Sequence, residues 1–87
     1  MMVYVRRVIC PGYFVRAVRA VYAYAVGRQS VTAGELLPVV AGAYREPLAW
    51  FSSAAVFAVV WRALLTAGGC ASYEDFLGLC LREGGYL

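Results

Sequence analysis

The stretch from Pro47 to Ala67, PLAWFSSAAVFAVVWRALLTA, carries a single charged residue, Arg62. Any helix formed by this stretch is apolar on every side, and a helix without a polar face must be enclosed by protein or by lipid. This segment therefore indicates a chain that is built to pack against something else.

The rest of the chain shares this apolar character, because 63% of its 87 residues are hydrophobic. A chain of this length forms a single domain, here residues 1–87, and buries only about 60 to 65% of the surface that its unfolded form exposes. The apolar residues that do not fit into the core must then lie on the surface of a lone subunit; we call them the apolar surplus. Large exposed apolar patches mark interaction sites. We therefore expect the chain to associate with itself, as a dimer or a larger assembly.

A membrane span is the competing explanation for the apolar surplus. The uncharged run covers only residues 47–61, whereas a span needs about 20 apolar residues. Trp50 and Trp61, which would mark the two membrane surfaces, are only about 16 Å apart along a helix. Length therefore argues against a membrane as a partner, and Arg16 and Arg19 interrupt the early apolar stretch that a signal peptide would need.

Charge is distributed unevenly along the chain, and all of the positive charge comes from arginine. Residues 1–28 contain five arginines and no acid, a local charge of +5, whereas residues 29–87 contain three arginines and five acids, a charge of −2. This asymmetry divides the domain into a basic arm with the first helix, 1–28, and an apolar helical assembly part, 29–87. The basic third predicts contact with an anion, and we expect this anion to be nucleic acid phosphate. The alternative is that these arginines only solvate one face of a very apolar protein.

The N-terminal part predicts an extended arm followed by a helix. Residues 2–9, MVYVRRVI, are rich in β-branched side chains and precede Pro11 and Gly12, although the segment is too short for periodicity to separate strand from helix. A lone strand leaves backbone groups unpaired, so such a β-arm is expected to pair with another chain. A helix over 13–26 then ends at Gly27. Its apolar face consists of Phe14, Val18, Val21 and Ala25.

Two interpretations are open for the second helix. Thr32 and Glu35 have the spacing of a capping box, which predicts a helix start there. Pro38 would remove a hydrogen bond inside such a helix. The helix is therefore either kinked at Pro38, or begins at Pro38 and runs to Arg45.

Two more helices complete the predicted fold. Pro47 suits the first turn of the long apolar helix, which Gly68 and Gly69 end. The last helix runs from Tyr73 to about Glu83, with Ser72 and Asp75 at its start and Gly84 and Gly85 after its end. The predicted fold class is all-α, a small four-helix domain with a short N-terminal β-arm.

Catalytic and metal-binding patterns are absent from the sequence. Histidine, the usual acid–base group near neutral pH, does not occur. Cys10, Cys70 and Cys80 lack the spacing and the fourth ligand of a zinc site. Helical residues between Cys70 and Cys80 would hold their Cα atoms about 15 Å apart, too far for a disulfide, which favours buried free thiols and a reducing compartment. We therefore expect no enzyme, no cofactor, no metal and no small-molecule substrate.

One family resemblance follows from the order of these segments over residues 2–46. The arm VYVRRVI, a proline before the helix YFVRAVRAVYAYAV, then Gly27 and Arg28 and a second helix starting near Thr32 resemble the ribbon-helix-helix family, the Arc-type repressors. In that family the N-terminal strands of two subunits pair into a ribbon that reads the major groove. The resemblance implies that Tyr4 and Arg6 face the bases and that residues 30–32 hold a phosphate.

Two sets of residues are candidates for the functional surfaces. Nucleic-acid contacts are predicted in the arm, the first helix and the loop after it, at Tyr4, Arg6, Arg7, Arg16, Arg19, Arg28, Ser30 and Thr32. An oligomer interface is predicted in the arm and the long helix, at Val3, Val5, Trp50, Phe51, Phe57, Val60, Trp61 and Leu64.

Three functional hypotheses follow. The first is a cytoplasmic, non-enzymatic, nucleic-acid-associated helical oligomer, a repressor-like dimer that contacts DNA through its basic N-terminal third. The second is a structural subunit of a virion shell or filament, packed through apolar helices. The third is an accessory subunit of a larger complex.

Overall fold

The computed structural model of the chain describes residues 11–28, 30–43, 50–67 and 72–87, with the side chains of all of these except 50–53. Four α-helices lie in these ranges, namely α1 (Pro11–Ala25), α2 (Ala33–Gly42), α3 (Trp50–Ala67) and α4 (Tyr73–Glu83). The prediction of an all-α fold with four helices is confirmed. The predicted β-arm over 2–9 lies outside the described residues and stays a prediction.

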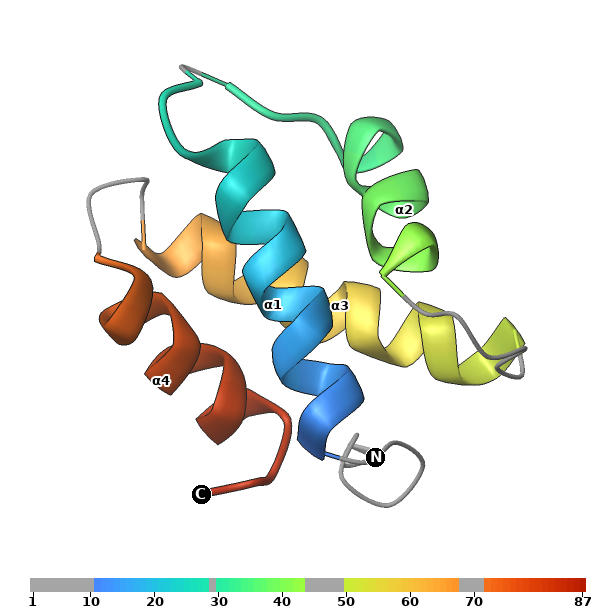
Figure 1. Cartoon of the computed structure of the whole chain (residues 1–87), viewed down its shortest axis with the longest axis vertical. Helices are drawn as coiled ribbons and strands as arrows, with labels where there is room; N and C mark the ends of the chain where they lie inside the picture. Colours follow the sequence, from blue (N-terminus) through green and yellow to red (C-terminus); the bar gives the residue numbers. More distant parts are fainter. Residues whose placement is uncertain (1–10, 29, 44–49, 68–71) are drawn as a thin grey trace.

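Helix α1 is the central element of the arrangement. It packs against each of the other three helices, and α3 also packs against α2 and α4. Figure 1 shows α1 between α2 and α4, with α3 crossing behind it. The residues of α1 that are exposed beyond its first turn are Arg16, Arg19 and Ala23, and we call them the outward strip of α1.

The core consists of apolar side chains that come from all four helices. Phe14, Val18 and Val21 of α1 are fully buried, which confirms the predicted inward face of this helix. Ala17 is buried with them, whereas Ala25 at the end of the helix is only half-buried. The other helices contribute Leu36, Val40, Val56, Val60, Ala63, Phe76 and Cys80.

Helix α2 begins at the capping box and contains Pro38. The hydroxyl of Thr32 accepts a hydrogen bond from the Glu35 backbone N–H at 3.3 Å, and Glu35 Oε2 accepts one from the Thr32 N–H at 3.1 Å. The alternative in which the helix begins at Pro38 is therefore wrong. Pro38 removes a hydrogen bond to the carbonyl of Gly34, and both residues are exposed, so the loss falls on the solvent side of the helix.

The way in which α4 ends explains the glycine at position 85. Gly85 has a φ of 86°, a left-handed conformation that suits glycine. The backbone N–H of Tyr86 donates to the Leu81 carbonyl at 2.8 Å and that of Gly85 to the Arg82 carbonyl at 3.2 Å, the two bonds of a Schellman motif. The predicted last helix is confirmed at both ends, because Ser72 caps its start.

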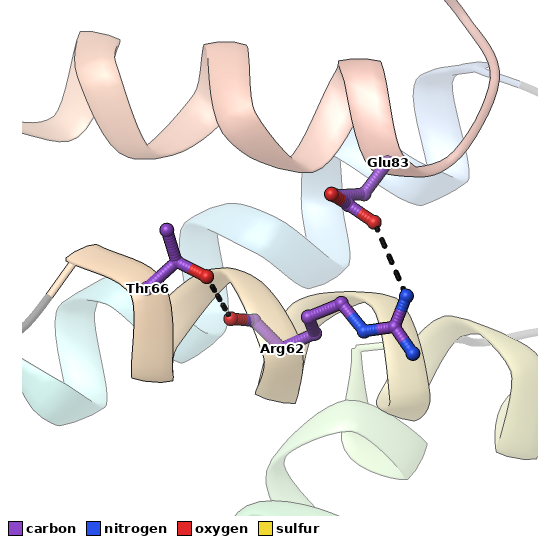
Figure 2. Close-up of polar contacts among 3 residues, drawn as sticks. All are labelled: Arg62, Thr66 and Glu83. Atoms are coloured by element: carbon purple, nitrogen blue, oxygen red, sulfur yellow. Dashed lines mark hydrogen bonds and ion pairs between the residues drawn. The ribbon is translucent and has the colours of Figure 1, made fainter.

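Helix α3 turns one side inward and leaves the opposite side exposed. Its buried residues are Val56, Val60 and Ala63, and the exposed side includes Arg62 and Leu65. Arg62 forms an ion pair with Glu83 of α4 at 3.6 Å, and its carbonyl accepts a hydrogen bond from the Thr66 hydroxyl at 3.0 Å (Figure 2). The helix predicted to need complete enclosure is thus only partly enclosed by its own chain. The predicted start at Pro47 lies outside the described residues.

Among the helices of the described ranges, none combines the length and the apolar character that crossing a membrane requires.

Candidate nucleic-acid interface

The outward strip of α1 carries two of the predicted phosphate contacts. Arg16 and Arg19 are both exposed, and they are three residues apart on the helix. Residues at this spacing lie on neighbouring positions of one face, while Phe14, Ala17 and Val18 occupy the inward face. The core-directed pattern of α1 therefore places both guanidinium groups in solvent on the same side of the protein.

Arg28 follows α1 and folds back onto the end of this helix. Its Nε–H donates a hydrogen bond to the Tyr24 backbone carbonyl at 2.7 Å. Its guanidinium carbon lies 4.1 Å from the centroid of the Tyr24 ring, a cation–π arrangement. The carbonyl at a helix C-terminus carries partial negative charge, so it attracts the guanidinium group. Arg28 remains exposed but has a defined position.

A second arginine–tyrosine pair lies at the start of α1. The Arg16 guanidinium carbon is 5.7 Å from the centroid of the Tyr13 ring, and Tyr13 is half-buried. Cation–π contacts at exposed sites contribute about 0.5 to 1 kcal/mol, enough to bias the direction of a long side chain. The sequence analysis missed both pairs, although the i, i+3 and i, i+4 spacings of tyrosine and arginine were visible.

Among the described residues, no acid forms an ion pair with these three arginines. In the part of the chain that the structure describes, the one ion pair joins Arg62 and Glu83. No carboxylate of this part lies within ion-pair distance of Arg16, Arg19 or Arg28. The electrostatic field of α1 is therefore available to an external anion.

The start of α2 has a different character from the one that the family resemblance implies. Both the N–H and the hydroxyl of Thr32 take part in the capping box. The Glu35 carboxylate thus occupies the helix N-terminus where the resemblance puts a phosphate, and its negative charge repels one. Ser30 is exposed beside this cap.

Several predicted contacts concern residues that the structure does not describe. They are the arm residues Val3, Tyr4, Val5, Arg6 and Arg7. Trp50 and Phe51 begin α3, but their side chains lie outside the described set. The functional assignments of these residues, and the ribbon on which the family resemblance depends, stay predictions.

The predicted oligomer interface on α3 divides into surface and core residues. Phe57 and Trp61 are half-buried and stack with ring centroids 6.2 Å apart and planes inclined by 11°. Leu64 is half-buried as well. Val60, by contrast, is fully buried in the core of its own chain, which leaves it no surface for a partner. Leu65, which the sequence analysis did not single out, is 64% exposed.

Cys80 is a free, fully buried thiol. Its burial, together with the nearby charge of Glu83, raises its pKa from 9.0 to about 12. A nucleophilic cysteine needs the opposite shift. Within the described ranges no three side chains of His, Cys, Asp or Glu gather as a metal site would require. Cys10 and Cys70 lie outside these ranges.

Comparison of the chain with protein-family models, with curated proteins and with solved structures finds no match.

Proposed function

We propose that this chain is a non-enzymatic protein that binds nucleic acid through the outward strip of α1. The observation that carries the proposal is the exposure of Arg16 and Arg19 on one face of α1, with Arg28 exposed just after the helix. Arginine presents five N–H donors in a planar fork that matches the oxygens of a phosphate. No carboxylate of the described residues forms an ion pair with these three arginines, which supports phosphate binding over simple solvation of the surface.

The N-terminal arm extends the same proposal. Arg6 and Arg7 precede α1 in the sequence and bring the charge of residues 1–28 to +5. Phosphate contacts release condensed counterions, so every additional arginine strengthens binding and its dependence on salt. We propose that the arm and α1 contact the same nucleic acid, in a cytoplasmic protein that acts as a dimer or larger assembly.

The test measures binding as a function of salt. Fluorescence anisotropy with a labelled oligonucleotide of about 15 nucleotides, single-stranded or as a duplex, is recorded between about 50 and 200 mM salt. Each arginine on a phosphate adds about 0.7 to 0.9 to the slope of log K against log salt. The double variant Arg16→Gln, Arg19→Gln is expected to lower that slope by about 1.5.

A matched control separates this surface from net charge. Arg62→Gln removes one positive charge from α3, where Arg62 is paired with Glu83, and is expected to leave the slope within about 0.3 of the parent value. Circular dichroism verifies that each variant keeps its helices. An unchanged slope in the double variant, or an equal loss in Arg62→Gln, contradicts the proposal.

A second candidate function is a structural subunit of a shell or filament. Leu65 is 64% exposed on α3, and the half-buried stack of Phe57 and Trp61 belongs to the same helix, which supports packing between subunits. Light scattering with and without a short duplex distinguishes the candidates. A repressor-like protein stops at a dimer or tetramer, whereas a lattice protein continues to grow with concentration.

A further inference from the structure

The side of α3 that its own chain leaves uncovered is apolar. Ala54, Ala58 and Leu65 are exposed there. Trp61, which follows Ala58 by three residues and precedes Leu65 by four, lies on the same side and is half-buried. We call these four residues the outward face of α3. Their spacing is that of the apolar seam by which one helix packs lengthwise against another.

Burial on the opposite side fixes the direction of this face. Val56 and Val60 are fully buried in the core. Ala54 and Ala58 each precede one of these valines by two residues, about 200° around the helix. Helix α3 crosses behind α1 in Figure 1 and packs against α1, α2 and α4. The outward face of α3 is therefore turned away from α1 and from the arginines of its outward strip.

The order of small and large residues in this face is self-complementary. The midpoint between positions 54 and 65 is also the midpoint between positions 58 and 61. In an antiparallel pair of α3 helices centred there, Ala54 meets Leu65 of the partner subunit and Ala58 meets Trp61 of the partner subunit. Each small side chain then faces a large one, so the layers interdigitate. A parallel pair would place alanine against alanine and tryptophan against tryptophan, which leaves gaps beside crowded layers.

Charges at the edge of the face also suit a second copy. Arg62 is the one charged residue of α3, and it pairs with Glu83 at 3.6 Å (Figure 2). The side chains of Arg62 and Glu83 are 65% and 36% exposed, so both are within reach of an approaching subunit. An antiparallel two-fold contact brings this edge against the same edge of the other copy. Positive and negative charges then alternate along the contact, and like charges need not meet.

The length of the face sets the expected strength of the contact. Helix α3 has 18 residues, which corresponds to about 27 Å. A contact along this length buries on the order of 1,000 Å² over both subunits, the low end for specific protein interfaces. We expect a dissociation constant on the order of 10 μM. At about 1 μM chain, a concentration suited to urea unfolding, the protein is then monomeric and Leu65 is exposed.

We propose that the outward face of α3 joins two copies of this chain into an antiparallel, two-fold symmetric dimer. This inference rests on the assembly part of the proposed function and names the contact that the assembly uses. A patch that contacts its own copy closes at two subunits. The contact leaves the outward strip of α1 free on each subunit, so dimer formation and nucleic-acid binding use separate surfaces.

Sedimentation equilibrium measures this contact. Between about 1 and 300 μM chain, the average mass is expected to rise from that of one chain to that of two. Leu65→Glu places a carboxylate in the contact twice per dimer and should raise the dissociation constant at least about 100-fold. The matched control is Leu37→Glu, the same exchange at an exposed leucine of α2, which should leave the dissociation constant within about 2-fold of the parent value.

An exchange of the facing residues tests the antiparallel register. Leu65→Ala alone removes the large member of a layer and should raise the dissociation constant about 10-fold or more. The double variant Ala54→Leu, Leu65→Ala returns one leucine and one alanine to each layer, and should recover to within about 3-fold of the parent. Leu65→Ala with Thr66→Leu restores a leucine beside the face and should stay as weak as Leu65→Ala. Circular dichroism establishes that each variant is folded.

The outcomes separate this inference from the proposed function. A chain that stays monomeric up to about 300 μM overturns the inference and the assembly part of the proposed function, and its sedimentation with phosphatidylcholine vesicles would assign the face to lipid. Growth beyond two copies overturns the closed contact and favours a shell or filament. A dimer that Leu65→Glu leaves intact, or a double variant that does not recover, overturns the assignment to this face and register. With the dimer intact, absence of nucleic-acid binding overturns the proposed function and upholds the inference.

Discussion

Replacing Phe14 with alanine is the most direct test of the packing in this fold. The Phe14 ring is fully buried, and its centroid is 4.7 Å from that of Tyr86. A Cβ atom placed on Gly84 would lie 3.2 Å from Phe14 Cζ, so the ring also fits closely against the chain after α4. Truncation of a buried phenylalanine to alanine costs about 3 to 5 kcal/mol. A chain of 87 residues has a total stability of about 4 to 13 kcal/mol.

Urea unfolding followed by circular dichroism measures this loss. With a denaturant dependence of about 1 kcal/mol per molar urea, Phe14→Ala should lower the midpoint by about 3 M or more. If this variant is unfolded in buffer, Phe14→Leu provides a measurable loss of about 1 kcal/mol. The control is Leu65→Ala on the exposed side of α3, which should stay within about 0.5 kcal/mol of the parent.

The comparison between Phe14 and Leu65 can refute the reasoning. A midpoint for Phe14→Ala within the range of Leu65→Ala would show that the ring is not part of the core. A loss for Leu65→Ala as large as that for Phe14→Ala, with a midpoint that depends on protein concentration, would show that subunits cover this side of α3.

Three further substitutions probe local interactions. Thr32→Ala removes the hydroxyl that caps α2 and should cost about 1 kcal/mol in urea unfolding, whereas no change would contradict the capping box. The buried hydroxyl of Tyr73 has no hydrogen-bond partner among the described residues, so Tyr73→Phe should be neutral or stabilise by about 1 kcal/mol, and a clear loss would reveal a partner. Burial holds the pKa of Cys80 at about 12, so the unfolded state releases this proton first, and the free energy of unfolding should fall as pH rises from about 9 toward 12. The free energy of Cys80→Ala should fall less over that window, and parallel curves would argue against a buried thiol.

The ends of the helices follow from local sequence. The capping box at Thr32 and Glu35, the cap at Ser72, and the glycines after α1 and α4 act over a few residues, so pattern alone predicts them. The inward face of α1 is predictable for the same reason, because its apolar residues recur at helical spacing. The choice between the two starts of α2 needed the structure, since a capping box and an internal proline point in opposite directions.

The candidate site was only partly predictable. Exposure of Arg16 and Arg19 follows from the apolar face opposite to them. The position of Arg28 does not follow from this pattern, because Arg28 lies after the helix. The direction of its side chain depends on the ring and the carbonyl of Tyr24. The packing of α1 against α2 and α4 is likewise a property of the assembled helices.

The sequence by itself determined that this chain forms helices, where most of them end, and that its positive charge gathers near the N-terminus. Only the tertiary structure decided which side of α3 is buried. An apolar helix has no periodic pattern that could select one side. Packing of α1, α2 and α4 selects Val56, Val60 and Ala63, and leaves Leu65 exposed, because burial depends on the shapes of the neighbouring helices as well as on the hydrophobicity of each residue.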